Sequence, residues 1–253
     1  MRCSMTSHSG ARYLYAVKHA REVPASLPSG IGGTAVYALT DGDVAAIVSA
    51  TGLAKVRPER RNLLAHHTVI QSLATEGTVL PVAFGTIATS EIALRRMLKK
   101  HRTMLGSELA RLADHVEMSV RLNWDVPDVF RHLIDVRPDL KAARDAMLAL
   151  GGAVTRGDKI ELGSRFERVL NEERARHAAL VDEALDACCQ EIRHDPPRCE
   201  TEILRLTCLV RNAELGRFES NVTAVSRELD DSLVLKYSGP CPPHHFVNLN
   251  MSL

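Results

Sequence analysis

The fold is decided by residues 116–124, which read Val-Glu-Met-Ser-Val-Arg-Leu-Asn-Trp. Apolar side chains recur at every second position, and the positions between them are polar. Successive side chains of a strand point to opposite faces, so this period of two predicts a β-strand with one buried face. The buried positions are Val116, Met118, Val120 and Leu122, and the polar ones are Glu117, Ser119 and Arg121.

Helices are expected directly after this strand. Two short ones are predicted at 127–135 and 138–150, the second ended by Gly151 and Gly152. A loop at 151–163 then leads to a long helix from Ser164, whose hydroxyl caps the first turn while Glu167 reaches back. Pro196-Pro197 is expected to end this helix.

The later elements are a strand at 203–210, a helix at 214–229 and a strand at 233–237. Together with the strand at 116–124, they resemble a β-α-β-β-α-β plan with extra helices inserted after the first strand. A second short strand near 198–202 is needed to complete that plan. This half of the chain is therefore expected to be ferredoxin-like with a helical insertion.

The first half of the chain predicts a separate mixture of strands and helices. A strand is expected at 12–17, and apolar runs at 35–39 and 44–49 flank Asp41-Gly42. Asp-Gly between two apolar runs is a strong hairpin signal, because glycine adopts a positive φ without steric cost. The remaining elements are a helix from Pro58 to Gly77, a strand at 78–82 and a helix at 90–114.

We therefore predict an α+β protein of two domains, 12–114 and 115–238, followed by a C-terminal tail at 239–253 that docks back. Three prolines of the tail are expected to exclude regular secondary structure. They are Pro240, Pro242 and Pro243.

Composition points to an ordinary globular protein of 253 residues. The net charge of +1 gives no overall field toward nucleic acid or a membrane. No run of 18 apolar residues is present, and the first residues lack the apolar core of a secretion signal. The six cysteines form no Cys-x-x-Cys pair and are expected to be reduced thiols. We expect a cytoplasmic protein without a membrane partner.

Motifs of catalysis or cofactor binding give no site. Gly30–Ala35 fits the dinucleotide pattern, but it follows a loop and precedes a strand, whereas phosphate binding needs a helix start after the glycines. The adjacent histidines at 66–67 point about 100° apart on a helix and cannot easily share a metal. Cys241 with the histidines at 244–245 lacks a fourth ligand. We predict no catalytic residue, no cofactor site and no metal site.

A basic stripe lies on the helix expected at 90–114, opposite its leucine face. It consists of Arg95, Arg96, Lys99, Lys100 and Arg102. Such a stripe is usually a solvated helix face, and its functional interpretation is docking to an acidic partner. RNA-binding sheets of the expected type stack bases on aromatic side chains, and segments 118–121 and 204–208 have none, so no nucleic-acid partner is expected.

Four segments of the chain carry a resemblance. They are Thr78-Val-Leu-Pro-Val-Ala-Phe-Gly-Thr86, His115-Val-Glu-Met-Ser-Val120, Gly157-Asp-Lys-Ile-Glu-Leu-Gly-Ser-Arg165 and Gly239-Pro-Cys-Pro-Pro-His-His-Phe-Val247. In this order and spacing over residues 12–249, they resemble the gas vesicle protein F/L family. The tail of that family usually has Trp at the position of Cys241 and Tyr at the position of His244, so two large packing groups differ here.

The resemblance implies a non-enzymatic accessory protein of gas vesicle formation, with no cofactor. Family members are similar in having two α+β domains, the second a modified ferredoxin fold with inserted helices, held together by the C-terminal tail. They are expected to bind the small hydrophobic shell protein and other accessory proteins during vesicle nucleation, or to become a minor component of the vesicle. The residues expected to anchor the domains through the tail are Pro240, Pro242, Pro243 and Phe246.

Two other classes of function stay open. A small-molecule-binding or enzymatic α+β protein would use the loop at Phe84-Gly85-Thr86. A nucleic-acid binder would use the basic stripe, and its retention on DNA or RNA would be sensitive to salt.

Overall fold

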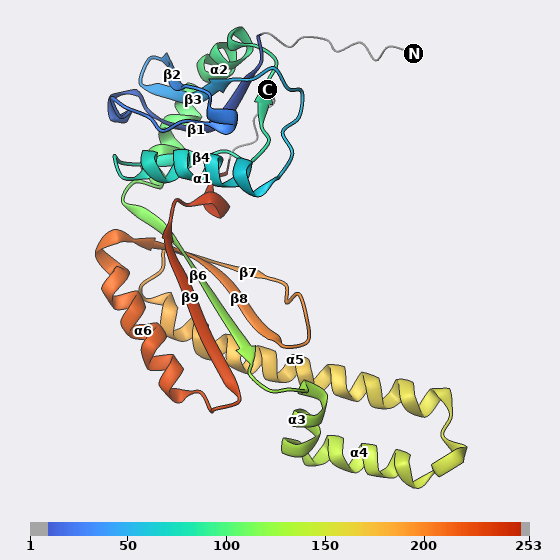
Figure 1. The fold of residues 1–253 in the computed structure, drawn as a ribbon. Helices are drawn as coiled ribbons and strands as arrows, with labels where there is room; N and C mark the ends of the chain where they lie inside the picture. The colour runs from blue at the N-terminus through green and yellow to red at the C-terminus, as the bar shows by residue number, and fades with distance from the viewer. Residues whose placement is uncertain (1–9, 249–253) are drawn as a thin grey trace, which may run out of the picture. The chain divides into compact units, whose positions relative to one another are not determined.

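The computed structural model describes residues 10–248 and contains two antiparallel sheets, each with helices packed on it (Figure 1). Its described residues group into two compact units. Unit 1 comprises residues 10–117 together with 240–248, and unit 2 comprises residues 118–239. The chain therefore leaves unit 1, builds the whole of unit 2 and returns to unit 1.

Unit 1 is a sheet with a helix on each face (Figure 1). Its strands run in the order β2-β3-β1-β4, and β5 also pairs with β1. The hairpin predicted at Asp41-Gly42 is confirmed, with Gly42 at a φ of 61°. The elements are β1 (Arg12–His19), β2 (Val36–Asp41), β3 (Val44–Ala50), α1 (Arg60–Ala74), β4 (Val79–Pro81), β5 (Ile87–Ala88) and α2 (Glu91–Arg111). Because α1 and α2 cover both faces, β3 is buried over all but its last residue.

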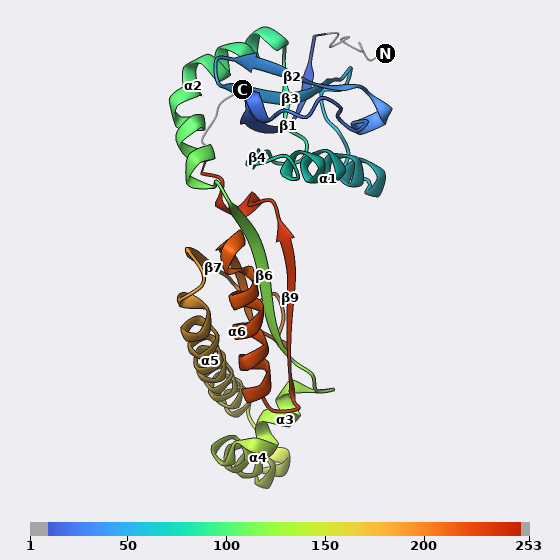
Figure 2. The same cartoon turned by 90° about the vertical axis from the view of Figure 1, so that its left-hand side faces the viewer.

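Unit 2 is built on a sheet of order β7-β8-β6-β9. Helices α5 and α6 lie together against one face of this sheet (Figure 2). Every second residue of β6 from Met118 to Trp124 is buried in the core that the sheet forms with these helices. The elements are β6 (His115–Trp124), α3 (Val129–Val136), α4 (Pro138–Ala149), α5 (Arg156–Asp186), β7 (Glu191–Asp195), β8 (Glu202–Arg211), α6 (Leu215–Glu228) and β9 (Leu233–Cys241). This is the expected β-α-β-β-α-β order, with α3 and α4 inserted before α5.

The predicted start of the long helix is wrong. Helix α5 begins at Arg156, eight residues before Ser164. The Thr155 hydroxyl accepts a hydrogen bond from the backbone N–H of Asp158 at 3.2 Å, and the Asp158 carboxylate accepts one from the N–H of Thr155 at 2.7 Å. This reciprocal cap satisfies two backbone donors, so the helix starts there despite the glycines of its first turns.

The predicted end of the helix and the position of the second strand are also wrong. Helix α5 ends at Asp186, and the strand is β7 at Glu191–Asp195 rather than near 198–202. Apolar residues continue the helical spacing up to Ile192, but this residue pairs with Cys208 of β8. Pairing with β8 therefore places Ile192 in a strand, although the spacing of apolar residues predicts a helix there. Pro196-Pro197 follows a strand instead of a helix.

The tail is more regular than predicted. Strand β9 continues through Pro240 to Cys241, and a short 3₁₀ helix follows at His244–Phe246. Strand β9 is at the edge of its sheet, where proline can lack an N–H without breaking a ladder hydrogen bond. Within residues 10–248, no helix combines the length and the apolar character needed to cross a membrane.

Candidate functional site

The end of the chain is held within unit 1 by buried side chains. Phe246 is completely buried, and Pro242 and Pro243 are buried as well. Pro240, in contrast, is exposed, so burial does not hold this fourth predicted anchor. Three of the four tail residues singled out from the sequence therefore make packed contacts.

Polar groups fix the same segment. The Glu117 carboxylate accepts hydrogen bonds from the backbone N–H and from Nδ1 of His245, at 2.8 and 2.7 Å. The guanidinium of Arg111 donates to the carbonyl oxygen of Phe246, and Glu108 accepts from the N–H of Asn248 at 3.0 Å. We call Glu108, Arg111 and Glu117 the tail clamp. Glu108 and Arg111 lie at the end of α2, and Glu117 lies at the start of β6. The clamp therefore connects residues 245–248 to the junction of α2 and β6.

The tail clamp was missed by sequence reasoning. Glu117 falls on the polar side of the alternating strand, which suggests solvent exposure, yet its side chain is buried under the tail. Burial also raises the pKa of the Cys241 thiol and lowers the pKa of His244. Within the described part of the chain, no group of three or more His, Cys, Asp or Glu side chains is arranged to hold a metal ion.

The basic stripe lies on the exposed face of α2. Arg95 is paired with Glu91 at 2.9 Å, and Arg102 lies 3.8 Å from Asp41 of the hairpin. Within residues 10–248 no ion pair engages the other three residues of the stripe, which are exposed. These three are Arg96, Lys99 and Lys100. The stripe is therefore divided into a part neutralised within unit 1 and a part that presents net positive charge.

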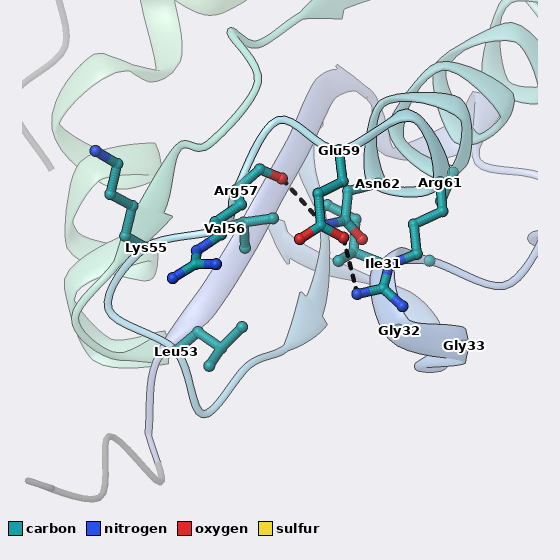
Figure 3. A pocket seen from close by; sticks show the side chains of 12 residues that line it. Ile31, Gly32, Gly33, Leu53, Lys55, Val56, Arg57, Glu59, Arg61 and Asn62 are labelled. Atoms are coloured by element: carbon teal, nitrogen blue, oxygen red, sulfur yellow. Dashed lines mark hydrogen bonds and ion pairs between the residues drawn. The ribbon is translucent and has the colours of Figure 1, made fainter.

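A hollow of about 570 Å³ lies beside the glycine-rich loop at 30–33 (Figure 3). Its other wall is the segment from Leu53 to Asn62, which leads into α1. Arg61 pairs with Glu59 at 2.8 Å, and Asn62 donates to the carbonyl oxygen of Arg57 at 3.0 Å (Figure 3). The loop is followed by β2, so the helix start that a dinucleotide pyrophosphate needs does not follow these glycines.

A buried polar network supports this loop and the predicted Phe84-Gly85-Thr86 loop. The Tyr15 hydroxyl accepts from the N–H of Ile31, and the Tyr13 hydroxyl accepts from the N–H of Gly85, both at 2.9 Å. Tyr13 also contacts Nδ1 of His66 at 3.1 Å. Burial lowers the pKa of His66 to about 4 and raises the pKa of Tyr13 to about 12. His66 and Tyr13 are therefore neutral at pH 7. The hydroxyls of Tyr13 and Tyr15 hold the backbone of the two loops in place.

An apolar groove lies between α3, α4 and α5 of unit 2, and sequence reasoning did not find it. Its hollow of about 240 Å³ is lined by Phe130, Ile134, Leu140, Met147, Lys159, Leu162, Gly163 and Phe166. The rings of Phe130 and Phe166 stack with centroids 3.9 Å apart, yet Phe130 is 44% exposed. A second hollow of about 290 Å³ shares Met147 and Leu162 with the groove, but it lies on a different side of α5, at Asp158, Glu161 and Arg165.

Known proteins match the chain over almost its whole length. The family described as gas vesicle synthesis protein GvpL/GvpF matches residues 11–248. Gas vesicle protein F of Streptomyces sp. (strain CB03234) is 31% identical over 242 residues, which cover 93% of this chain and 98% of that protein. Gas vesicle protein F of Microcystis aeruginosa (strain PCC 7806) is 25% identical over 206 residues, or 80% and 84% of the two chains.

Solved structures share the fold. The crystal structure of GvpF from Anabaena sp. PCC7120 superposes with a TM-score of 0.83 at 23% identity, and covers 96% of this chain and 100% of that one. GvpF from Microcystis aeruginosa gives 0.80 at 23% identity, with 94% and 99% covered. The α+β fold expected from the sequence is thereby confirmed. The chain belongs to the GvpL/GvpF family of gas vesicle synthesis proteins, and its role is in gas vesicle formation.

Proposed function

We propose that this chain is a non-enzymatic accessory protein that binds the small hydrophobic shell protein of the gas vesicle during nucleation. Other accessory proteins are further partners, and the place of action is the growing vesicle in the cytoplasm. Membership of the family over residues 11–248 supports a role in vesicle formation. Gas vesicle protein F of Streptomyces sp. (strain CB03234) supports the same role, because that match covers 93% of this chain and 98% of that protein.

One observation carries the binding proposal: large apolar side chains are exposed in both units. Three of them lie on α1 or in the segment before it, namely Leu53, Leu63 and Leu64. Five more lie on or next to α3, α4 and α5, namely Phe130, Val136, Leu148, Leu150 and Ile160, and of these Phe130 lines the apolar groove. A shell subunit with an apolar gas-facing surface aggregates if that surface stays bare, and exposed apolar side chains on a partner can cover it until assembly.

The basic stripe supports a second kind of contact within the same function. Its three residues without an ion pair in the described chain offer a positive surface to an acidic accessory protein. Such a contact contributes mainly to the rate and specificity of association, and it weakens as salt screens the charges.

Co-expression with the shell protein tests the proposal. We expect this chain to increase the soluble fraction of the shell protein and to co-purify with it, whereas an unrelated α+β protein of similar size does neither. The proposal fails if the shell protein precipitates equally in both cases and is absent from the purified chain. A nucleic-acid function is tested on the same preparation, because it predicts salt-sensitive retention on immobilised DNA or RNA.

A further inference from the structure

The geometry of unit 2 points to a specific occupant of the apolar groove. We infer that the groove binds an amphipathic helix of a partner polypeptide, with apolar side chains on one face and acidic residues at one end. This inference rests on the proposed function for the partner's identity, which is the shell protein. The chemistry of the groove itself comes from the residues of α3, α4 and α5.

The shape of the groove suits a helix. Helices α4 and α5 contact each other, and the groove runs between them. A furrow between two packed helices accepts the side-chain ridge of a third helix. The lining runs from Leu140 to Met147 on α4 and from Lys159 to Phe166 on α5, a length of about 10 Å, which corresponds to about two turns of a bound helix. Two turns present the i, i+3, i+4 and i+7 anchors of helix-in-groove recognition.

Gly163 leaves room for the bound helix. It lines the groove from within α5, and a Cβ placed on it meets no atom within 4 Å. A partner side chain can therefore approach the backbone of α5 at this position of the groove wall.

Charge makes the two ends of the groove different. Lys159 lines it, and Arg156 lies one turn before Lys159 on the same side of α5. Neither takes part in an ion pair within residues 10–248, whereas Glu161 is paired with Arg165 at 2.6 Å. The Asp158 carboxylate keeps its negative charge in the cap with Thr155, but it does not line the groove, so Lys159 is the charged residue of the lining. The other end is formed by the stacked rings of Phe130 and Phe166. A helix with carboxylates at one end therefore binds in one direction.

The test uses the full chain and two synthetic helical peptides of 14 residues with the same leucine face. One peptide carries glutamates at one end, and the other carries lysines there. By fluorescence anisotropy, we expect the glutamate peptide to bind at least tenfold more tightly, with the preference reduced in high salt. Lys159→Glu is expected to reverse the preference.

Gly163→Trp supplies the decisive variant, because the indole fills the groove from a position with open space. Gly216→Trp is the matched control: Gly216 lies in α6, is exposed and also has no atom within 4 Å of an added Cβ. We expect Gly163→Trp to lose at least tenfold in peptide affinity and Gly216→Trp to stay within twofold of the unmodified chain, both with unchanged circular dichroism. Equal affinity in the two variants, or no binding of either peptide, overturns the groove inference.

The shell protein distinguishes this inference from the proposed function. If the chain binds the glutamate peptide but not the shell protein, the groove is a helix site and the proposed partner is wrong. If the chain co-purifies with the shell protein as well after Gly163→Trp as before, the proposed function stands and the groove is not where the shell protein binds.

Discussion

Replacing Phe246 by alanine tests whether the tail is held by burial. The Phe246 ring is completely buried, and Phe→Ala changes at such positions cost about 3–5 kcal/mol. The hydrogen bonds of the tail clamp involve the Phe246 carbonyl and the neighbouring backbone, so alanine leaves their donors and acceptors in place. The loss should therefore come from packing and should favour local detachment of residues 241–248. At about 1.4 kcal/mol per decade, it increases the open population of the tail by roughly two to three and a half orders of magnitude.

Hydrogen exchange measures this population directly. The amides to follow are those of His245 and Asn248, which donate to Glu117 and Glu108. The matched control is Pro240→Ala, because Pro240 is an exposed residue of the same segment. It should change the opening free energy by no more than about 0.5 kcal/mol. Unchanged exchange in Phe246→Ala, or an equal acceleration in Pro240→Ala, refutes the role given to the buried ring.

Three further predictions concern pH, the start of α5 and the basic stripe. Burial lowers the pKa of His66 to about 4, so between pH 6.5 and 4 the unfolded chain binds a proton that the folded chain does not, and stability falls as the pH falls. His66→Gln should remove about 3 kcal/mol of that pH dependence in urea unfolding between pH 7 and 4, and equal slopes in the two proteins contradict the assignment. Thr155→Ala should destabilise the first turns of α5 by about 1 kcal/mol, seen as faster amide exchange there, whereas Ser164→Ala should change little; a larger effect at Ser164 would restore the helix start expected from the sequence. Serine at the three stripe residues without an ion pair in the described chain should leave the melting temperature nearly unchanged but reduce co-purification of acidic gas vesicle proteins, and co-purification that resists high salt argues against the stripe.

The sequence predicts most strands and helices of this fold because their signals are local. The alternation at 116–124, the Asp41-Gly42 turn and the leucine face of α2 each specify an element without distant contacts. The errors occur where a distant partner decides. Ile192 continues a helical spacing of apolar residues, but it pairs with β8 and lies in a strand. No feature of the neighbouring sequence indicates that pairing. The start of α5 is different, because Thr155 and Asp158 form a cap that is visible in the sequence. Gly157 lies between them, and glycine is typical of a loop rather than of a first helical turn.

The interaction surfaces are less predictable than the fold. The basic stripe can be found from helical spacing, but its division depends on Glu91 and on Asp41, which lies in the hairpin. Glu117 looks like a solvent-facing residue until the tail covers it, since its partner lies 128 residues away. The apolar groove requires α3, α4 and α5 to pack together, so its lining comes from 37 residues of sequence with no common motif. Only the resemblance drew attention to the segment around Gly163.

The order of the two units along the chain has a consequence for biosynthesis. Unit 1 receives residues 240–248 only after the ribosome has made all of residues 118–239. While unit 2 is being translated, the space that Phe246 fills is therefore still open, and the Glu117 carboxylate does not yet have His245 as a partner. Unit 1 can therefore complete its fold only after unit 2 has been synthesised.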